Sequence, residues 1–471
     1  MNSRTIAGFA VGPLTTAAIS VITVPAVAWA WPAEDVGRYN LMQVSVSFVV
    51  LVAALGLDQG YVREFHEVTD SSVLVRSAFA PGLLTVIAMA VPALLFAEPL
   101  ALALFGKNDA RLAWVLVATS AAALVARYLS LILRMQERAL AFSVSQALPK
   151  LLFLAVLMTV GLLSTSHRFL PLAAALLISW LGAVAVTAWS TRDTWAPAVR
   201  HRMDPALTSR LLRYSFPLML TGLAYWALTA TGSLMLRSLS TLAELGVYSV
   251  AVSFAGAAVV VQTIFSVIWA PVVYRWAASN QDMAKVDRVA DQMLALVAVL
   301  FCLVGTCSSL VDVVLPERYA MVKYAVLATI AVPLLYALSE VTGIGINLSR
   351  RTSWSVAATL AALGVSVILS LLLVPTLGAR GAALASMLGY LAFFFARTEA
   401  SRRTWRGMPR ARLYMTTTAL CALATAGVVW GPTSGHWYAL PWGVATVVVL
   451  SIFRREWRTM AQTVRAVRTG A

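Results

Sequence analysis

Long apolar stretches separated by short polar gaps run along the whole chain. A helix needs roughly 20 mostly apolar residues to cross bilayer hydrocarbon about 30 Å thick while satisfying its own backbone groups. Fourteen such spans can be drawn, near residues 12–30, 40–57, 77–97, 111–131, 146–165, 170–190, 214–236, 247–270, 290–311, 321–343, 354–374, 381–397, 413–430 and 438–453. The pattern predicts an all-α polytopic membrane protein with about 14 transmembrane helices.

The positive charges fall mainly in every second gap between these spans. With the N-terminus in the cytoplasm, 28 of the 36 Lys and Arg residues lie on the inner side and eight on the outer side, as the positive-inside rule requires. The inner set includes Lys150, near the start of the fifth span, and Arg397, in the basic run before the thirteenth. We therefore expect a multi-pass protein of the bacterial inner (plasma) membrane with both termini cytoplasmic.

Composition agrees with a chain whose solvent is lipid. Hydrophobic residues make up 60% and charged residues 12%, and the mean hydropathy is +0.81. The net charge of +16 comes without a soluble domain, so it indicates contact with anionic membrane lipids rather than with nucleic acid. All three cysteines lie within proposed spans and the four histidines are scattered over different loops, so we expect no disulfide, metal site or cofactor.

Two parts of the chain repeat a short pattern six spans apart. Pro13 opens a span that is followed by residues 35–39 (DVGRY), and Pro217 opens one followed by residues 244–248 (ELGVY). Because six is even, both copies keep the same orientation and form a parallel repeat. Chance similarity of short Gly/Tyr turns is the alternative. The repeat predicts two six-helix lobes in parallel pseudo-twofold repeat plus two C-terminal helices, with lobes at 1–200 and 201–400 and helices 13–14 with a basic cytoplasmic tail at 401–471.

Several motifs in this order resemble those of one transporter family. They are residues 55–63 (LGLDQGYVR), 212–218 (LRYSFPL), 244–251 (ELGVYSVA), 269–271 (WAP) and 377–383 (LGARGAA). Over nearly its whole length the chain resembles the O-antigen, capsule and exopolysaccharide flippases of the multidrug/oligosaccharidyl-lipid/polysaccharide exporter superfamily. It departs from them in the seventh span, where relatives often carry an acidic-basic pair and this chain has residues 231–233 (TGS), which puts a coupling-ion site there in doubt.

The resemblance implies a flippase that moves polyprenyl-pyrophosphate-linked sugar repeat units from the cytoplasmic to the periplasmic leaflet by alternating access. Such transport serves the synthesis of lipopolysaccharide or exopolysaccharide. Its partners would be the lipid-linked glycan, a polysaccharide polymerase and the export machinery. An ion-coupled multidrug exporter of the same superfamily is the alternative, and a membrane polysaccharide polymerase or ligase is a further one. No Walker, HExxH or GxSxG motif is present, and we expect no enzyme.

A pyrophosphate carried past hydrocarbon requires a cationic passage, and arginine suits it because its planar fork stays charged and makes two hydrogen bonds. The candidates are the arginines at inner helix ends, namely Arg63, Arg127, Arg134, Arg213 and Arg275. Aromatic and amide side chains on spans seven and eight are candidates for sugar contacts, namely Trp226, Gln262 and Tyr274. The alternatives are that the arginines anchor helices by reaching to headgroups and that the aromatic residues only pack.

Two acidic residues are candidates for coupling. Glu340, in span ten, is the most clearly intramembrane acid, and it either takes up a coupling proton or pairs with Arg127 or Arg134. Asp58 lies at a helix end and is expected to pair with Arg63. Four tryptophans look like members of the interfacial aromatic belt, namely Trp29, Trp31, Trp437 and Trp442.

Overall fold

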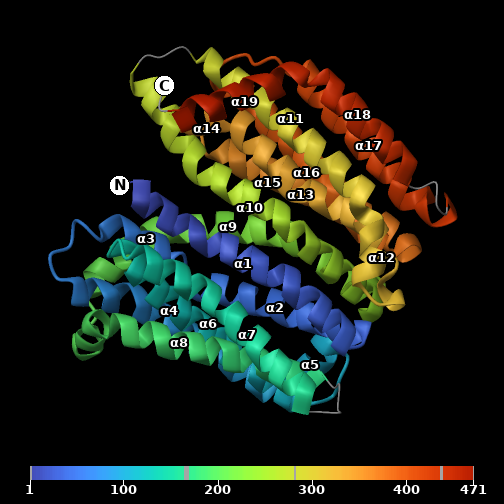
Figure 1. The fold of residues 1–471 in the computed structure, drawn as a ribbon. Helices are drawn as coiled ribbons and strands as arrows, with labels where there is room; N and C mark the ends of the chain where they lie inside the picture. The colour runs from blue at the N-terminus through green and yellow to red at the C-terminus, as the bar shows by residue number, and fades with distance from the viewer. Residues whose placement is uncertain (1–2, 164–168, 280–282, 435–438, 470–471) are drawn as a thin grey trace. The chain divides into compact units, whose positions relative to one another are not determined.

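The computed structural model describes residues 3–163, 169–279, 283–434 and 439–469, and these are almost entirely helical (Figure 1). They form two compact units that divide after Ala230. The first contains α1 (Ser3–Ala30), α2 (Ala33–Ala53), α3 (Leu57–Glu64), α4 (Ser71–Leu95), α5 (Ala97–Phe105), α6 (Ala110–Met135), α7 (Ala139–Leu163), α8 (Phe169–Arg200) and most of α9 (Pro205–Leu239).

The second unit begins inside α9. It continues with α10 (Leu242–Ala278), α11 (Ala284–Cys307), η1 (Ser308–Leu310), α12 (Val311–Val314), η2 (Glu317–Tyr319), α13 (Val322–Thr342), α14 (Ile344–Leu348), α15 (Ser353–Leu377), α16 (Ala379–Thr404), α17 (Ala411–Ser434), α18 (Leu440–Ile452) and α19 (Arg454–Thr469). The lobe boundary expected at residue 200 stays a prediction.

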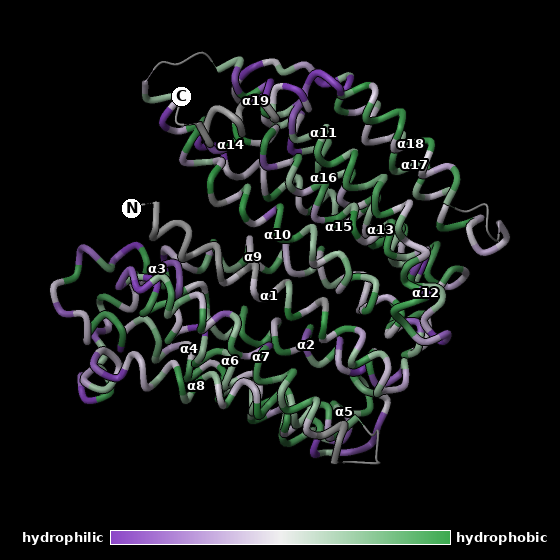
Figure 2. The backbone as a smooth tube through the Cα atoms, in the orientation of Figure 1, coloured by the Kyte–Doolittle hydropathy of each residue, from purple (hydrophilic) through white to green (hydrophobic). Residues whose placement is uncertain are grey.

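Length and composition make this a multi-pass membrane protein. Among the described residues 12 helices are long and apolar enough to cross a membrane, and α1 and α18 add shorter apolar segments at Ala18–Ala30 and Leu440–Ile452. Figure 2 shows hydrophobic positions along these helices and hydrophilic ones gathered toward their ends. The expected all-α polytopic fold with about 14 spans is confirmed.

The two units repeat one packing scheme. In the first, α6 is the central helix and contacts α2, α4 and α8, while α7 packs along α8. In the second, α13 is central and contacts α10, α11 and α16, while α15 packs along α16. When the long helices are counted from α1 and again from α9, which spans the boundary, each central helix is the fourth and meets the second, third and sixth. The internal repeat predicted from the sequence is therefore present in the packing.

The acid of the repeated acid-aliphatic-Gly-x-Tyr motif joins two helices in each unit. The Glu244 carboxylate accepts a hydrogen bond of 2.7 Å from the backbone N–H of Ala379, which begins α16. The preceding Gly378 has φ +55°, and a side chain there would collide with Glu244. In the first unit Asp35 pairs with Arg38, whose Nε donates to the carbonyl oxygen of Phe105 at the end of α5.

Tryptophan placement differs from the sequence expectation. Trp31 and Trp442 are each 1% exposed, so the prediction that they belong to an interfacial belt is wrong. Trp29 is 61% exposed, and for it the belt stays a prediction, while Trp437 lies outside the described residues. Trp442 on α18 lies over Gly305 of α11, where even a Cβ atom would approach its ring to 2.1 Å. Hydropathy alone does not reveal such a site, because a tryptophan that packs on a glycine has the same sequence signature as one at a membrane interface.

The C-terminal helix α19 is tied to the second unit by a charge pair. Arg412 of α17 donates to Glu456 over 2.5 Å, and its guanidinium lies over the ring of Phe453. Burial alone raises the pKa of Glu456, but the hydrogen bond and charge of Arg412 outweigh it and hold that pKa below its usual value.

The helix cap formed by Glu244 gives a first testable prediction. Glu244→Ala removes the acceptor for the Ala379 N–H and should lower the free energy of unfolding by about 1 to 2 kcal/mol. The measurement is thermal or steric-trap unfolding of purified protein in detergent. Glu317→Ala, at an exposed position, is the matched control and should change nothing. Equal stability of Glu244→Ala and the wild type would contradict the capping role.

Candidate functional site

The short helix α3 forms a corner between α2, α4, α6 and α9, and its sequence explains the bend. Leu55 and Gly56 have positive φ angles of 50° and 69°, which end α2 and redirect the chain. A Cβ atom on Gly56 would lie 2.4 Å from the carbonyl oxygen of Ser215, and one on Gly60 would lie 2.6 Å from the Ser215 hydroxyl. The motif LGLDQGYVR therefore lets α3 lie directly against α9.

Two carboxylates of α3 are buried and each holds an arginine from a different helix. Asp58 accepts a hydrogen bond of 2.6 Å from Arg127 of α6, and Glu64 accepts one of 2.6 Å from Arg210 of α9. The carboxylate side chains are 9% and 7% exposed, whereas the arginine side chains are 47% and 59% exposed. Each carboxylate thus fixes one edge of a guanidinium and leaves the rest of it open.

Two further arginines adjoin this arrangement, which we call the α3 corner (Asp58, Arg63, Glu64, Arg127, Arg210 and Arg213). The guanidinium of Arg63 lies 4.3 Å from the ring centroid of Tyr214, and Arg213 is the neighbouring exposed residue on α9. Four arginines and two carboxylates leave the α3 corner with a net charge of about +2. A cation–π contact and two charge pairs preorganise these groups without neutralising them.

Tyr128, next to Arg127, fixes the position of α6 against α4. Its ring stacks on Phe79 with centroids 4.2 Å apart, and a Cβ atom on Gly82 would lie 1.9 Å from its hydroxyl oxygen. That hydroxyl is buried without a hydrogen-bond partner among the described residues. Close packing of Tyr128 on α4, rather than a hydrogen bond, therefore fixes the position of the neighbouring Arg127 relative to α4.

Some expected site residues in the first unit lie apart from the α3 corner or have other partners. Asp58 binds Arg127 and not Arg63, so the predicted Asp58–Arg63 pair is wrong. Neighbours along one short helix point to different sides, and Arg63 turns to Tyr214 instead. Arg134 is exposed in the last turn of α6, and Trp226 is half-buried on α9 and donates to the Ser47 hydroxyl over 3.0 Å.

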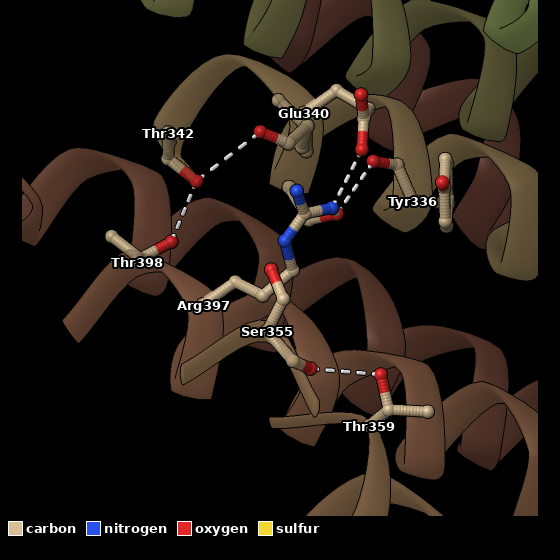
Figure 3. Close-up of polar contacts among 9 residues, drawn as sticks. Tyr336, Glu340, Thr342, Ser355, Thr359, Arg397 and Thr398 are labelled. Carbon is tan, nitrogen blue, oxygen red and sulfur yellow. Dashed lines mark hydrogen bonds and ion pairs between the residues drawn. The ribbon is translucent and has the colours of Figure 1, made fainter. Parts of the chain in front are cut away.

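In the second unit the central feature is a pair between Glu340 and Arg397 (Figure 3). Glu340 lies in the last turn of α13 and accepts a hydrogen bond of 2.6 Å from Arg397 of α16, which also donates to the Ser339 hydroxyl. The expected pairing of Glu340 with Arg127 or Arg134 is therefore wrong. So is the placement of Arg397 in a loop, because its side chain is 7% exposed inside α16.

One member of each ion pair occupies an equivalent place in the repeat. Glu137 follows α6 and Arg350 follows α14, the short helix after α13, with φ angles of 57° and 56°, and the next residue in each case donates to a carbonyl five positions back. These markers are 213 residues apart (350 − 137), and so are Arg127 and Glu340 (340 − 127). The same position thus carries a cation in one unit and an anion in the other.

The candidates on α10 are separate from this pair. Gln262 is half-buried in the middle of α10, and Tyr274 and Arg275 are exposed near its end. Among the described residues no hydrogen bond or ion pair joins any of them to Glu340. They remain predicted contacts.

Three functional candidates were missing from the sequence prediction. Glu64 and Arg210 are 146 residues apart and Arg397 is 57 residues from Glu340, so no local pattern pairs them. Arg397 sits in a basic run that the positive-inside rule explains completely. A signal was nevertheless present, because acids are rare in this chain and those near helix ends require partners inside a membrane.

Comparison with known proteins places the chain in a family. The family model described as polysaccharide biosynthesis protein matches residues 5–276, more than half of the sequence. The chain belongs to the polysaccharide biosynthesis protein family. No curated protein sequence matches it.

Solved structures show the same fold as this member of the polysaccharide biosynthesis protein family at low sequence identity. The lipid II flippase MurJ in an inward closed conformation has a TM-score of 0.68 at 10% identity, covering 96% of this chain and 97% of that one. An inward-facing multidrug resistance MATE transporter of the MOP superfamily has a TM-score of 0.62 at 16% identity, covering 87% and 98%. The D35N mutant of the Vibrio cholerae MATE transporter VcmN has a TM-score of 0.59 at 14% identity, covering 85% of this chain and 95% of that one.

The Asp58–Arg127 pair gives a second prediction, which separates folding from function. Arg127→Ala leaves a buried carboxylate without its charged partner, with only the Gln59 amide still donating to it, and should lower the free energy of unfolding by about 1 to 3 kcal/mol. Asp58→Asn combined with Arg127→Gln keeps two uncharged hydrogen-bonding groups and should recover most of that loss. Unfolding of the purified variants in detergent measures it. If the double variant is no more stable than Arg127→Ala, the loss does not come from an unpaired Asp58.

Proposed function

We propose that this protein is a flippase that moves polyprenyl-pyrophosphate-linked oligosaccharide repeat units from the cytoplasmic to the periplasmic leaflet by alternating access. It would serve the synthesis of a surface polysaccharide such as lipopolysaccharide or exopolysaccharide. Membership of the polysaccharide biosynthesis protein family and a fold like that of flippases and exporters support this proposal. The protein would lie in the bacterial inner membrane with both termini in the cytoplasm and would work with a polymerase and export machinery.

The observation that carries the proposal is the chemistry of the α3 corner. Arginines whose outer N–H groups remain open suit a pyrophosphate, because each guanidinium offers parallel donors to phosphate oxygens. The buried carboxylates Asp58 and Glu64 hold two of these arginines in place, which reduces the conformational entropy lost on binding. A net charge of about +2 attracts the ligand from the aqueous side.

The ion pair in the second unit is the candidate for coupling. Glu340 is 20% exposed while Arg397 is buried, so water or a proton reaches the carboxylate and not the guanidinium. Protonation of Glu340 would remove the negative charge that pairs with Arg397 and leave only neutral hydrogen-bond acceptors, the carboxyl group and the Ser339 hydroxyl, around a buried guanidinium. Loss of this pair would free α13 and α16 to shift against each other. Proton uptake at Glu340 would in this way be linked to a change of conformation.

Gene disruption tests the proposed function directly. Loss of the protein should cause lipid-linked glycan to build up in the inner leaflet and surface polysaccharide to fall, because synthesis continues while transfer stops. Both are measured by extraction of lipid-linked sugars and by polysaccharide blotting, with the wild-type gene returned as control. Unchanged lipid-linked glycan together with raised sensitivity to cationic dyes would contradict the proposal and support a multidrug exporter.

A substitution of Glu340 tests coupling. Glu340→Gln keeps a hydrogen bond to Arg397 but cannot ionise, so we expect export to fall at least tenfold while the protein remains at normal abundance in the membrane. Glu340→Asp keeps an ionisable group and should retain part of the activity. Glu399→Gln, nearer the end of α16, is the matched control. Normal export by Glu340→Gln would exclude a coupling role.

A further inference from the structure

Lys150 lies in the middle of the membrane-spanning helix α7. The sequence had placed it near the inner end of a span. Helix α7 runs from Ala139 to Leu163, so Lys150 is 11 residues from its first residue and 13 from its last. At 1.5 Å per residue these separations are about 16 and 20 Å. A lysine side chain is too short to bring its ammonium group to a headgroup across either distance.

The ammonium group of Lys150 is only partly satisfied. Its Nζ donates a hydrogen bond of 2.7 Å to the hydroxyl of Ser20 on α1, and the side chain is exposed. An ammonium group carries three donors, so two have no hydrogen-bond partner among the described residues. No carboxylate lies within 4.0 Å of it among the residues that the structure describes. An uncompensated charge at this depth costs several kcal/mol, and therefore requires water or an anion.

The face of α7 that carries Lys150 is turned toward α1 and α2, and the exposed apolar stripe lies elsewhere. Ser143 and Phe153 share this face, and both are buried, against Gly12 of α1 and the ring of Tyr39 of α2. A different stripe holds the exposed apolar residues, Leu140, Val144 and Leu151. Lipid contacts suit that second stripe, so Lys150 lies on the side of α7 that meets other helices of the first unit.

The fold itself does not require a cation at this position. The markers Glu137 and Arg350 relate α7 to α15 by the same displacement of 213 residues, which places Leu363 at the position equivalent to Lys150 (150 + 213). Helix α15 packs along α16 as α7 packs along α8. The second unit thus builds the equivalent helix pair with an apolar residue, so packing of this kind of pair does not itself require a lysine.

We propose that Lys150 is a mid-membrane binding residue for the phosphate groups of the transported lipid-linked glycan. The inference rests on the proposed function and adds a second cationic site, which the pyrophosphate meets after leaving the arginines of the α3 corner. Ser20 holds the ammonium group in place, and the two remaining N–H donors of Lys150 bind phosphate oxygens. Binding involves no covalent step. A diphosphate at half depth is then paired rather than bare, which lowers the barrier to crossing.

Complementation of a disrupted strain tests this assignment. Lys150→Gln keeps a donor to Ser20 but removes the charge, and should reduce surface polysaccharide at least tenfold at normal protein abundance. Lys150→Arg keeps the charge and should retain a substantial part of the wild-type level of surface polysaccharide. Ser20→Ala removes the tie to α1 and should lower export less than threefold, and Lys107→Gln is the control for loss of a positive charge outside the spans.

The outcomes separate the two proposals. Full export by Lys150→Gln, or an equal loss in Ser20→Ala, would overturn the role of Lys150 and leave the flippase intact. A disrupted strain without accumulated lipid-linked glycan would instead overturn the flippase. A measurement on wild-type protein avoids any folding defect: polyprenyl pyrophosphate should protect Lys150 from reductive methylation, read by peptide mass spectrometry, and uncharged polyprenol should not. Equal methylation with both lipids would overturn the assignment.

Discussion

A charge inside a bilayer must be paired, hydrated or neutralised, and this constraint decides how the polar groups of this protein are arranged. Asp58, Glu64 and Glu340 each meet an arginine from another helix over 2.6 Å. These pairs join helices that are distant in sequence. Removing one partner of such a pair leaves an uncompensated charge, so separating the two helices that carry it is energetically costly.

The repeat explains why two similar units can have different chemistry. The packing scheme around α6 recurs around α13, down to the left-handed residues Glu137 and Arg350, which follow α6 and the short helix α14. Within that frame the position of Arg127 in one unit is that of Glu340 in the other. The helix packing is therefore repeated, whereas the charge at this position is not. Our proposal assigns substrate binding to the unit with the open cation and coupling to the unit with the accessible anion.

Hydropathy and the positive-inside pattern predicted the helical fold and the number of spans, because these follow from length and composition, and the repeated short motif predicted the repeat. None of these patterns predicted which charged residues pair. Asp58 was expected to bind Arg63, its near neighbour, but the bend at Gly56 turns Asp58 to Arg127 on α6. Lys150 was expected near the inner end of a span because helix ends are hard to place from composition, and α7 begins several residues earlier than the apolar stretch. Charges near span ends are the residues for which sequence reasoning fails.

The most direct test of the central claim is transfer of a lipid-linked glycan by the purified protein in vesicles. A labelled polyprenyl-pyrophosphate oligosaccharide is placed in one leaflet, and its arrival in the other is measured by access of a sugar-modifying reagent. Wild-type protein should accelerate transfer well above that of protein-free vesicles. An Arg127→Gln, Asp58→Asn variant that is folded but lacks the cation should not. Equal transfer by wild-type protein and protein-free vesicles would contradict the flippase function.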